Sequence, residues 1–66
     1  MNSNPKTIKM IGNLRFEVSL LEMDNGNYYV SFQTLYDGEI GFIGPEADYR
    51  LAESMFETKL MELEGM

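Results

Sequence analysis

The chain contains no cysteine and no histidine. Without cysteine it has neither a disulfide nor a thiolate metal ligand with which to stabilise a small fold. Without histidine it lacks both the commonest metal ligand and the commonest general base of enzymes. We therefore predict a domain that is held together by apolar packing, that has no catalytic residues, and that binds no metal ion or cofactor.

Basic residues are few, since five Lys and Arg stand against eleven Asp and Glu and give a net charge of −6. Nucleic-acid binding draws its non-specific affinity from Lys and Arg contacts with phosphate, so direct binding of DNA or RNA is disfavoured. A basic protein partner is easier to reconcile with this charge.

The sequence also has no apolar run that approaches the roughly 20 residues of a membrane-spanning helix. Residues 1–6 are polar and do not contain the hydrophobic stretch of a signal peptide. We therefore expect no contact with membranes and a cytoplasmic location. We also expect a flexible N-terminal leader over residues 1–6, followed by a single domain over residues 7–66.

Alternating side chains mark the first half of this domain. Between residues 8 and 20 every even position except Gly12 is apolar, whereas the odd positions are mostly polar. A period of two is typical of a half-buried strand rather than of a helix. Gly12 and Asn13 interrupt the run with residues that favour turns, so we predict a hairpin of two strands at about 7–11 and 14–23.

The segment 24–27, Asp-Asn-Gly-Asn, is the strongest turn signal, and a third strand is predicted from Tyr28 to Tyr36. A two-residue loop would place Leu20 opposite Ser31 and so mix apolar with polar side chains. A three-residue loop with Gly26 in the left-handed conformation places Leu20 opposite Val30 instead. We prefer the second register because it keeps one face of the sheet apolar.

A short fourth strand is predicted over residues 39–43, although its glycines leave open which of its side chains face the core. From Glu46 to Glu64 the period becomes helical, with Pro45 suited to the first turn and Gly65 to the stop. One apolar stripe runs along this helix through Tyr49, Ala52, Phe56, Leu60 and Leu63. The predicted fold is thus α+β, a four-stranded antiparallel meander in the order β-β-β-β-α with the C-terminal helix packed on one face.

A second stripe on the predicted helix carries most of its acids, and we call it the acidic flank. It consists of Glu46, Arg50, Glu53, Glu57, Met61 and Glu64. Glu53 and Glu57 form a like-charged pair four residues apart, which costs about 0.2–0.5 kcal/mol. A partner-binding surface would explain such a penalty on one flank, although an ordinary solvated face is the simpler interpretation.

The sheet face away from the helix is the other candidate surface. In the preferred register it carries Ile11, Arg15, Leu21, Met23, Tyr29 and Leu35. A contiguous apolar patch on a small protein usually marks association with another chain. We expect self-association through this face or through an edge strand, most simply as a homodimer with two-fold symmetry.

Together these features predict a small acidic protein–protein interaction module that is not an enzyme and that associates with itself. The alternative hypothesis is an inhibitor that mimics nucleic acid, of the type that phages use against nucleic-acid-handling proteins. In that case the acidic flank would take the place of phosphate groups. Competition with DNA for a basic partner, steeply dependent on salt, would separate the two hypotheses.

Overall fold

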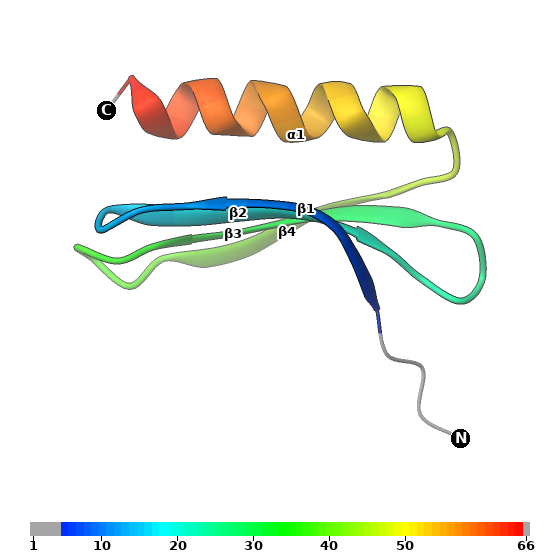
Figure 1. Ribbon diagram of the computed structural model, residues 1–66, viewed down its shortest axis with the longest axis horizontal. Coiled ribbons are helices and arrows are strands. Elements are labelled where there is room, and N and C mark those ends of the chain that lie inside the picture. The colour runs from blue at the N-terminus through cyan, green and yellow to red at the C-terminus, as the bar shows by residue number, and fades with distance from the viewer. Residues whose placement is uncertain (1–4, 66) are drawn as a thin grey trace.

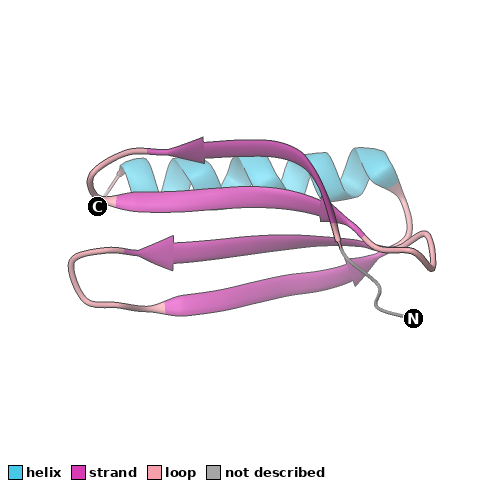
Figure 2. Ribbon diagram, turned by 60° about the horizontal axis from the view of Figure 1, so that its bottom comes forward, coloured by secondary structure: helices cyan, strands magenta, loops and turns pink. Residues whose placement is uncertain are grey.

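The computed structural model describes residues 5–65 and shows one open sheet with a helix lying along one of its faces (Figures 1 and 2). Its elements are β1 (Lys6–Gly12), β2 (Phe16–Glu22), β3 (Tyr28–Thr34), β4 (Ile40–Glu46) and α1 (Tyr49–Glu64). Neighbouring strands are antiparallel, and their spatial order β1-β2-β3-β4 follows the chain. The predicted fold class is therefore confirmed.

The pairing of β2 with β3 follows the register that keeps one face apolar. Leu20 lies opposite Val30, and the same register continues along the whole of both strands. At the turn the backbone N–H of Met23 donates to the carbonyl oxygen of Asn27, with 2.8 Å between the two atoms. Gly26 has a φ angle of +87°. The three-residue loop with a left-handed glycine is thus confirmed.

The core lies between this hairpin and α1, which packs over β2, β3 and β4. Its buried apolar side chains are Phe16, Val18, Leu20, Val30, Ala52, Phe56 and Leu63. Three residues of the predicted apolar stripe of the helix are thus buried, and Leu60 is half-buried beside them. Tyr49 lies at the margin, with its ring centre 5.4 Å from that of Tyr28.

An irregularity in β1 reverses the faces that the sequence predicted for the part of this strand that follows Ile8. The register shifts between Thr7 and Lys9, so that Ile11 lies opposite the buried Val18. One extra residue moves every later side chain of a strand to the other face. The prediction that Ile11 lies on the face away from the helix is therefore wrong. Met10 takes that position instead.

The fourth strand is longer than predicted and the helix begins later. β4 continues past Gly44 and Pro45, where its register shifts, and ends with Glu46 opposite Tyr28. An edge strand tolerates proline because its outer backbone groups need no partner in the sheet. The helix therefore begins at Tyr49, and the Asp48 side chain caps it by accepting a hydrogen bond from the backbone N–H of Arg50 at 2.8 Å. The predicted helix start at Glu46 is wrong.

The start of the sheet also differs slightly from the prediction. β1 already includes Lys6, which was assigned to the flexible leader. Residues 1–4 of that predicted leader lie outside the described residues.

Gly41 shows which way β4 faces. It lies opposite Phe32, and a Cβ atom at position 41 would stand 2.8 Å from Phe32 Cε1. The Phe32 ring thus occupies the space that a side chain at position 41 would need. Gly41 and Ile43 lie on the helix side of β4, whereas Ile40 and Phe42 lie on the open side.

We predict that Gly41→Ala lowers the free energy of unfolding by about 1–3 kcal/mol, because the added methyl group must displace a packed ring. Gly12→Ala is the matched control, since a Cβ there meets most closely the flexible Glu17 side chain, at 2.9 Å from its Cγ. Urea denaturation of the two variants measures both effects. Equal stability of the two would contradict the role assigned to Gly41.

Candidate functional site

The sheet face away from α1, here called the open face, is organised as three rows of residues that lie opposite one another across the strands. The first row is Thr7, Leu21 and Tyr29, the second is Met10, Ser19, Ser31 and Phe42, and the third is Gly12, Glu17, Gln33 and Ile40. Directly opposed residues of antiparallel strands project to the same side of a sheet. The open face is therefore built by all four strands.

Large apolar side chains stand at the margins of these rows. Met10 on β1 is 62% exposed, and on β4 Ile40 and Phe42 are 63% and 66% exposed. The middle of the second row consists of the small residues Ser19 and Ser31. The exposed apolar side chains thus lie on both sides of a row centre that consists of small polar residues.

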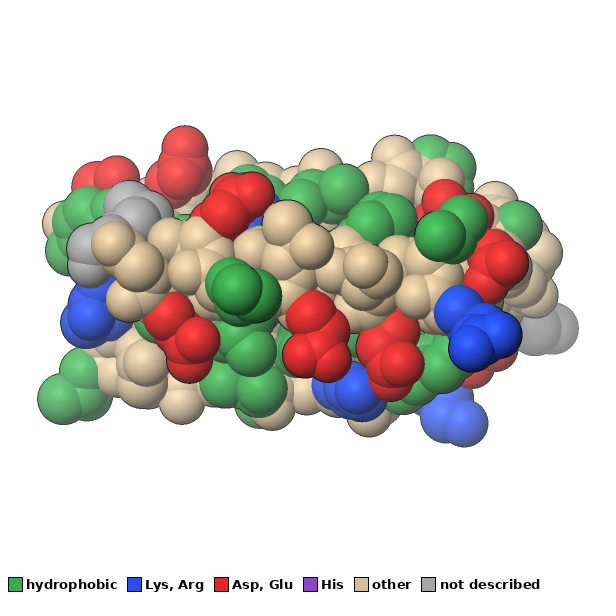
Figure 3. All heavy atoms as spheres, turned by 90° about the horizontal axis from the view of Figure 1, so that it is seen from above, with side chains coloured by type: hydrophobic (Ala, Val, Ile, Leu, Met, Phe, Trp, Pro, Cys, Tyr) green, Lys and Arg blue, Asp and Glu red, His purple; other side chains and the backbone are tan. Residues whose placement is uncertain are grey.

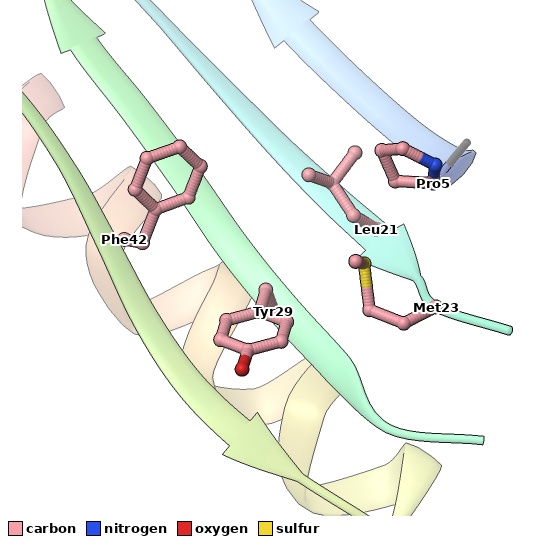
Figure 4. Close-up of a pocket in the computed structure, with 5 residues that line it drawn as sticks. All are labelled: Pro5, Leu21, Met23, Tyr29 and Phe42. Atoms are coloured by element: carbon pink, nitrogen blue, oxygen red, sulfur yellow. The ribbon is translucent and has the colours of Figure 1, made fainter. Parts of the chain in front are cut away.

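An apolar hollow occupies the part of the open face near the β2–β3 turn (Figure 4). It has a volume of about 300 Å³ and is lined by Pro5, Leu21, Met23, Tyr29 and Phe42. In Figure 4 these side chains stand on the near side of the sheet, while α1 passes behind it. None of the five is charged, so the hollow suits an apolar group.

Charge is nearly absent from the three rows of the open face, in contrast to the rest of the molecule. Glu17 is the one ionisable acid or base among the row residues. On the opposite side, seen in Figure 3, acidic side chains recur along the outer surface of the helix, with a few basic ones among them. The outer surface of α1 therefore carries many charged side chains, whereas the three rows of the open face carry one.

The structure brings together only part of the predicted sheet surface. Leu21, Met23 and Tyr29 line the hollow. Arg15 and Leu35 lie beyond the ends of β2 and β3, at the far end of the sheet, where the Leu35 backbone N–H donates to the Arg15 carbonyl oxygen at 2.8 Å. They are not part of the hollow.

Sequence reasoning missed three apolar residues of the open face. Met10 was not assigned to the open face, because nothing in the sequence indicated the register shift in β1. Ile40 and Phe42 alternate with the close-packed Gly41, and this alternation indicates that the two side chains lie on the same face of the strand. Without an established pairing between β3 and β4, however, it did not show which set faces the helix.

The acidic flank is less acidic in the structure than in the sequence. Glu46 belongs to β4 and is not on the helix at all, which corrects its assignment to this flank. Glu53 forms an ion pair with Lys9 of β1, with 2.7 Å between Oε2 and Nζ, and accepts a hydrogen bond from the Tyr49 hydroxyl at 3.2 Å.

Four members of the acidic flank remain exposed on α1. They are Arg50, Glu57, Met61 and Glu64. The exposed part of the flank thus combines two carboxylates with one guanidinium and one thioether. It does not form a continuous line of negative charge.

The Lys9–Glu53 pair ties the edge strand to the helix. The hydrogen bond and the positive charge of Lys9 lower the pKa of the Glu53 carboxyl, and the same contact raises the pKa of Lys9. Lys9 Nζ also lies 5.9 Å from the centre of the buried Phe56 ring. Because α1 packs over β2, β3 and β4, this long side chain is a main link between β1 and the helix.

Comparison of the chain with protein-family models, with curated proteins and with solved structures found no match. Among residues 5–65, no group of three or more acidic side chains is placed so as to hold a metal ion. Within the same part of the chain, α1 does not have the length and apolar content that crossing a bilayer requires.

We predict that Lys9→Gln lowers stability near neutral pH and that this difference from the wild type shrinks in acid. Because folding lowers the pKa of Glu53, its pairing stabilises the fold above the ordinary value of 4.5 and is lost as pH falls through the lower folded value. Urea denaturation between neutral and acidic pH measures the difference.

Lys6→Gln is the control for this prediction, since it removes the same charge from the same strand. Carboxyl NMR titration should also show a higher pKa for Glu53 in the Lys9→Gln protein. An unchanged Glu53 pKa would show that the ion pair does not persist in solution.

Proposed function

We propose that the protein is a small acidic protein–protein interaction module without catalytic activity, and that the open face is its contact surface. The observation that carries this proposal is the exposure of Met10, Ile40 and Phe42 on the open face, together with an apolar hollow that Phe42 helps to line. A cytoplasmic location and a protein partner, as the sequence indicated, belong to the same proposal.

The composition of the hollow resembles the centre of a protein interface more than an ordinary surface. Interface cores are depleted of charged residues and enriched in aromatic residues and methionine. The hollow combines Tyr29 and Phe42 with Met23, and the nearest rows contain no charge other than Glu17. Burial of such side chains contributes about 25 cal/mol for each Å² removed from water. This gain supports binding of another protein chain.

The inhibitor hypothesis receives less support. It depends on a series of carboxylates that imitates the phosphates of a nucleic acid. Glu46 is not on the helix, and Glu53 is neutralised by Lys9, so Glu57 and Glu64 are what remains exposed of the predicted acids on this flank. Two carboxylates beside Arg50 make a weak imitation of a phosphate backbone.

The absence of cysteine allows a direct test, because one introduced cysteine can carry a photo-reactive benzophenone at a chosen site. Thr7→Cys places the probe on the open face, at the edge strand and opposite Leu21. Thr58→Cys is the matched control, because it makes the same exchange at an exposed position of α1. Irradiation in an extract of the source cell should give covalent protein adducts with the Thr7→Cys probe and not with the control.

The adducts should disappear when unlabelled wild-type protein is added in excess. Addition of a Phe42→Lys protein should leave them in place, because the lysine disrupts the apolar surface that the partner recognises. Equal labelling from both probe positions, or no labelling from position 7, would refute the open face as a contact surface.

A further inference from the structure

We propose that the occupant of the open face is a second copy of this chain, stacked face to face in a dimer with two-fold symmetry. This inference rests on the proposed function and narrows it to one partner. Four properties of the molecule support it, namely the distribution of charge, the shape of the open face, the state of the sheet edges, and the area available.

The distribution of charge favours contact between open faces. Each copy carries a net charge of −6, so repulsion between two copies is smallest when they meet through surfaces that hold little of this charge. The open face meets that condition, because Glu17 is the one charged residue of its three rows. A contact between helices would instead bring Glu57 and Glu64 of both copies together.

Stacking through the open face also keeps the acidic helices apart. Two packed sheets lie about 10 Å from each other, and each helix would lie on the outer side of its own sheet. The two helical surfaces are then farther apart than the Debye length of about 8 Å at physiological ionic strength. Repulsion between them is largely screened in this arrangement.

The shape of the open face provides both halves of a reciprocal contact. Phe42 is an exposed ring at the margin of a hollow of about 300 Å³. A cavity of about 150 Å³ is enough to hold benzene, so the hollow can accept an aromatic ring from a facing molecule. In a two-fold dimer each surface patch meets its own equivalent region on the partner. The geometry points to Phe42 of each copy packing into the hollow of the other.

The edges of the sheet are poorly suited to the alternative, which is extension of the sheet by a second copy. The outer edge of β1 is broken by the register shift at Ile8 and carries Lys6 and Lys9. The outer edge of β4 is broken at Gly44–Pro45, where proline supplies no N–H group. Bulges, lysine and proline are the features that keep edge strands from pairing with other chains. Association through the face is therefore favoured over association through an edge.

The available area predicts a dimer of modest affinity. The strands run along the longest axis of the molecule and lie side by side along its shortest axis (Figure 1). The Cα positions of the sheet face therefore span at most 34 by 15 Å, or about 510 Å². Two such faces give at most about 1,000 Å², which is close to the lower limit for a specific interface. Dimerisation should therefore depend on concentration, with a Kd in the micromolar range.

Sedimentation equilibrium of the full chain between about 1 µM and about 1 mM brackets this Kd range. The wild type is compared with Phe42→Lys and Met10→Lys on the open face, and with Leu14→Lys as the control. Leu14 is 96% exposed in the β1–β2 turn. All three variants lower the net negative charge equally, so general repulsion decreases in each. Circular dichroism and urea denaturation establish that each variant is folded.

We expect the wild type to dimerise and Phe42→Lys to raise Kd by about a hundredfold or more, because the charge enters a symmetric contact twice. Met10→Lys should weaken the dimer in the same direction, and Leu14→Lys should leave Kd within about threefold. Raising NaCl from about 0.05 M to about 0.5 M should also change Kd by less than about threefold, since the interface contains few charges.

A wild type that stays monomeric, or a dimer that Phe42→Lys and Met10→Lys do not weaken, would overturn the inference. The photo-reactive Thr7→Cys probe then distinguishes failure of the proposed dimer from failure of the proposed interaction module. If the monomer labels a different protein, the second copy is refuted while the interaction module is retained. If the monomer labels nothing, both proposals fail together.

Discussion

The pairing of Leu20 with Val30 determines which side of the two central strands is buried, and the rest of the molecule depends on it. Both side chains are fully buried beneath α1, together with Val18, and belong to the same core cluster as Phe56 of the helix. A shift by one residue would turn the apolar set of one strand toward solvent. Residues 5–65 contain one helix, and that helix covers one face. The register that builds the core therefore also leaves the other face of the sheet uncovered.

The two register shifts lie on the edge strands and determine what the uncovered face contains. The shift in β1 turns Met10 outward and directs Lys9 to the helix side, where it reaches Glu53. The shift at Gly44–Pro45 lets β4 extend to Glu46, which leaves the helix to begin only after Asp48. Edge irregularities thus have two effects. They protect the outer edges from pairing, and they divide charged from apolar side chains between the two faces.

The predictable parts of this arrangement are those that a local sequence pattern determines. Alternation and the Asn25-Gly26 turn were sufficient for the β2–β3 register, and the helical stripe was sufficient to identify Phe56 as core. The register shift near Ile8 could not be predicted, because no glycine or proline stands beside it in the sequence. The Lys9–Glu53 contact could not be predicted either, because it joins residues 44 positions apart. At the helix start two local signals competed, since both Pro45 and Asp48 suit a helix N-terminus. The pairing of Glu46 with Tyr28 decided between them, and such pairing is a property of the tertiary fold.

The size of the core connects the fold with the proposed association. Within residues 5–65 seven apolar side chains are buried, which is a small core for a chain without disulfides. Domains of this length bury only about 60% of the surface that the unfolded chain exposes, so their stability is low. A partner that binds only the folded state adds to that stability by mass action. Exposed apolar side chains on the uncovered face are therefore a cost for the monomer, and in the proposed dimer they would become a source of stability. The near absence of charge in the rows of that face would allow two acidic chains to use it.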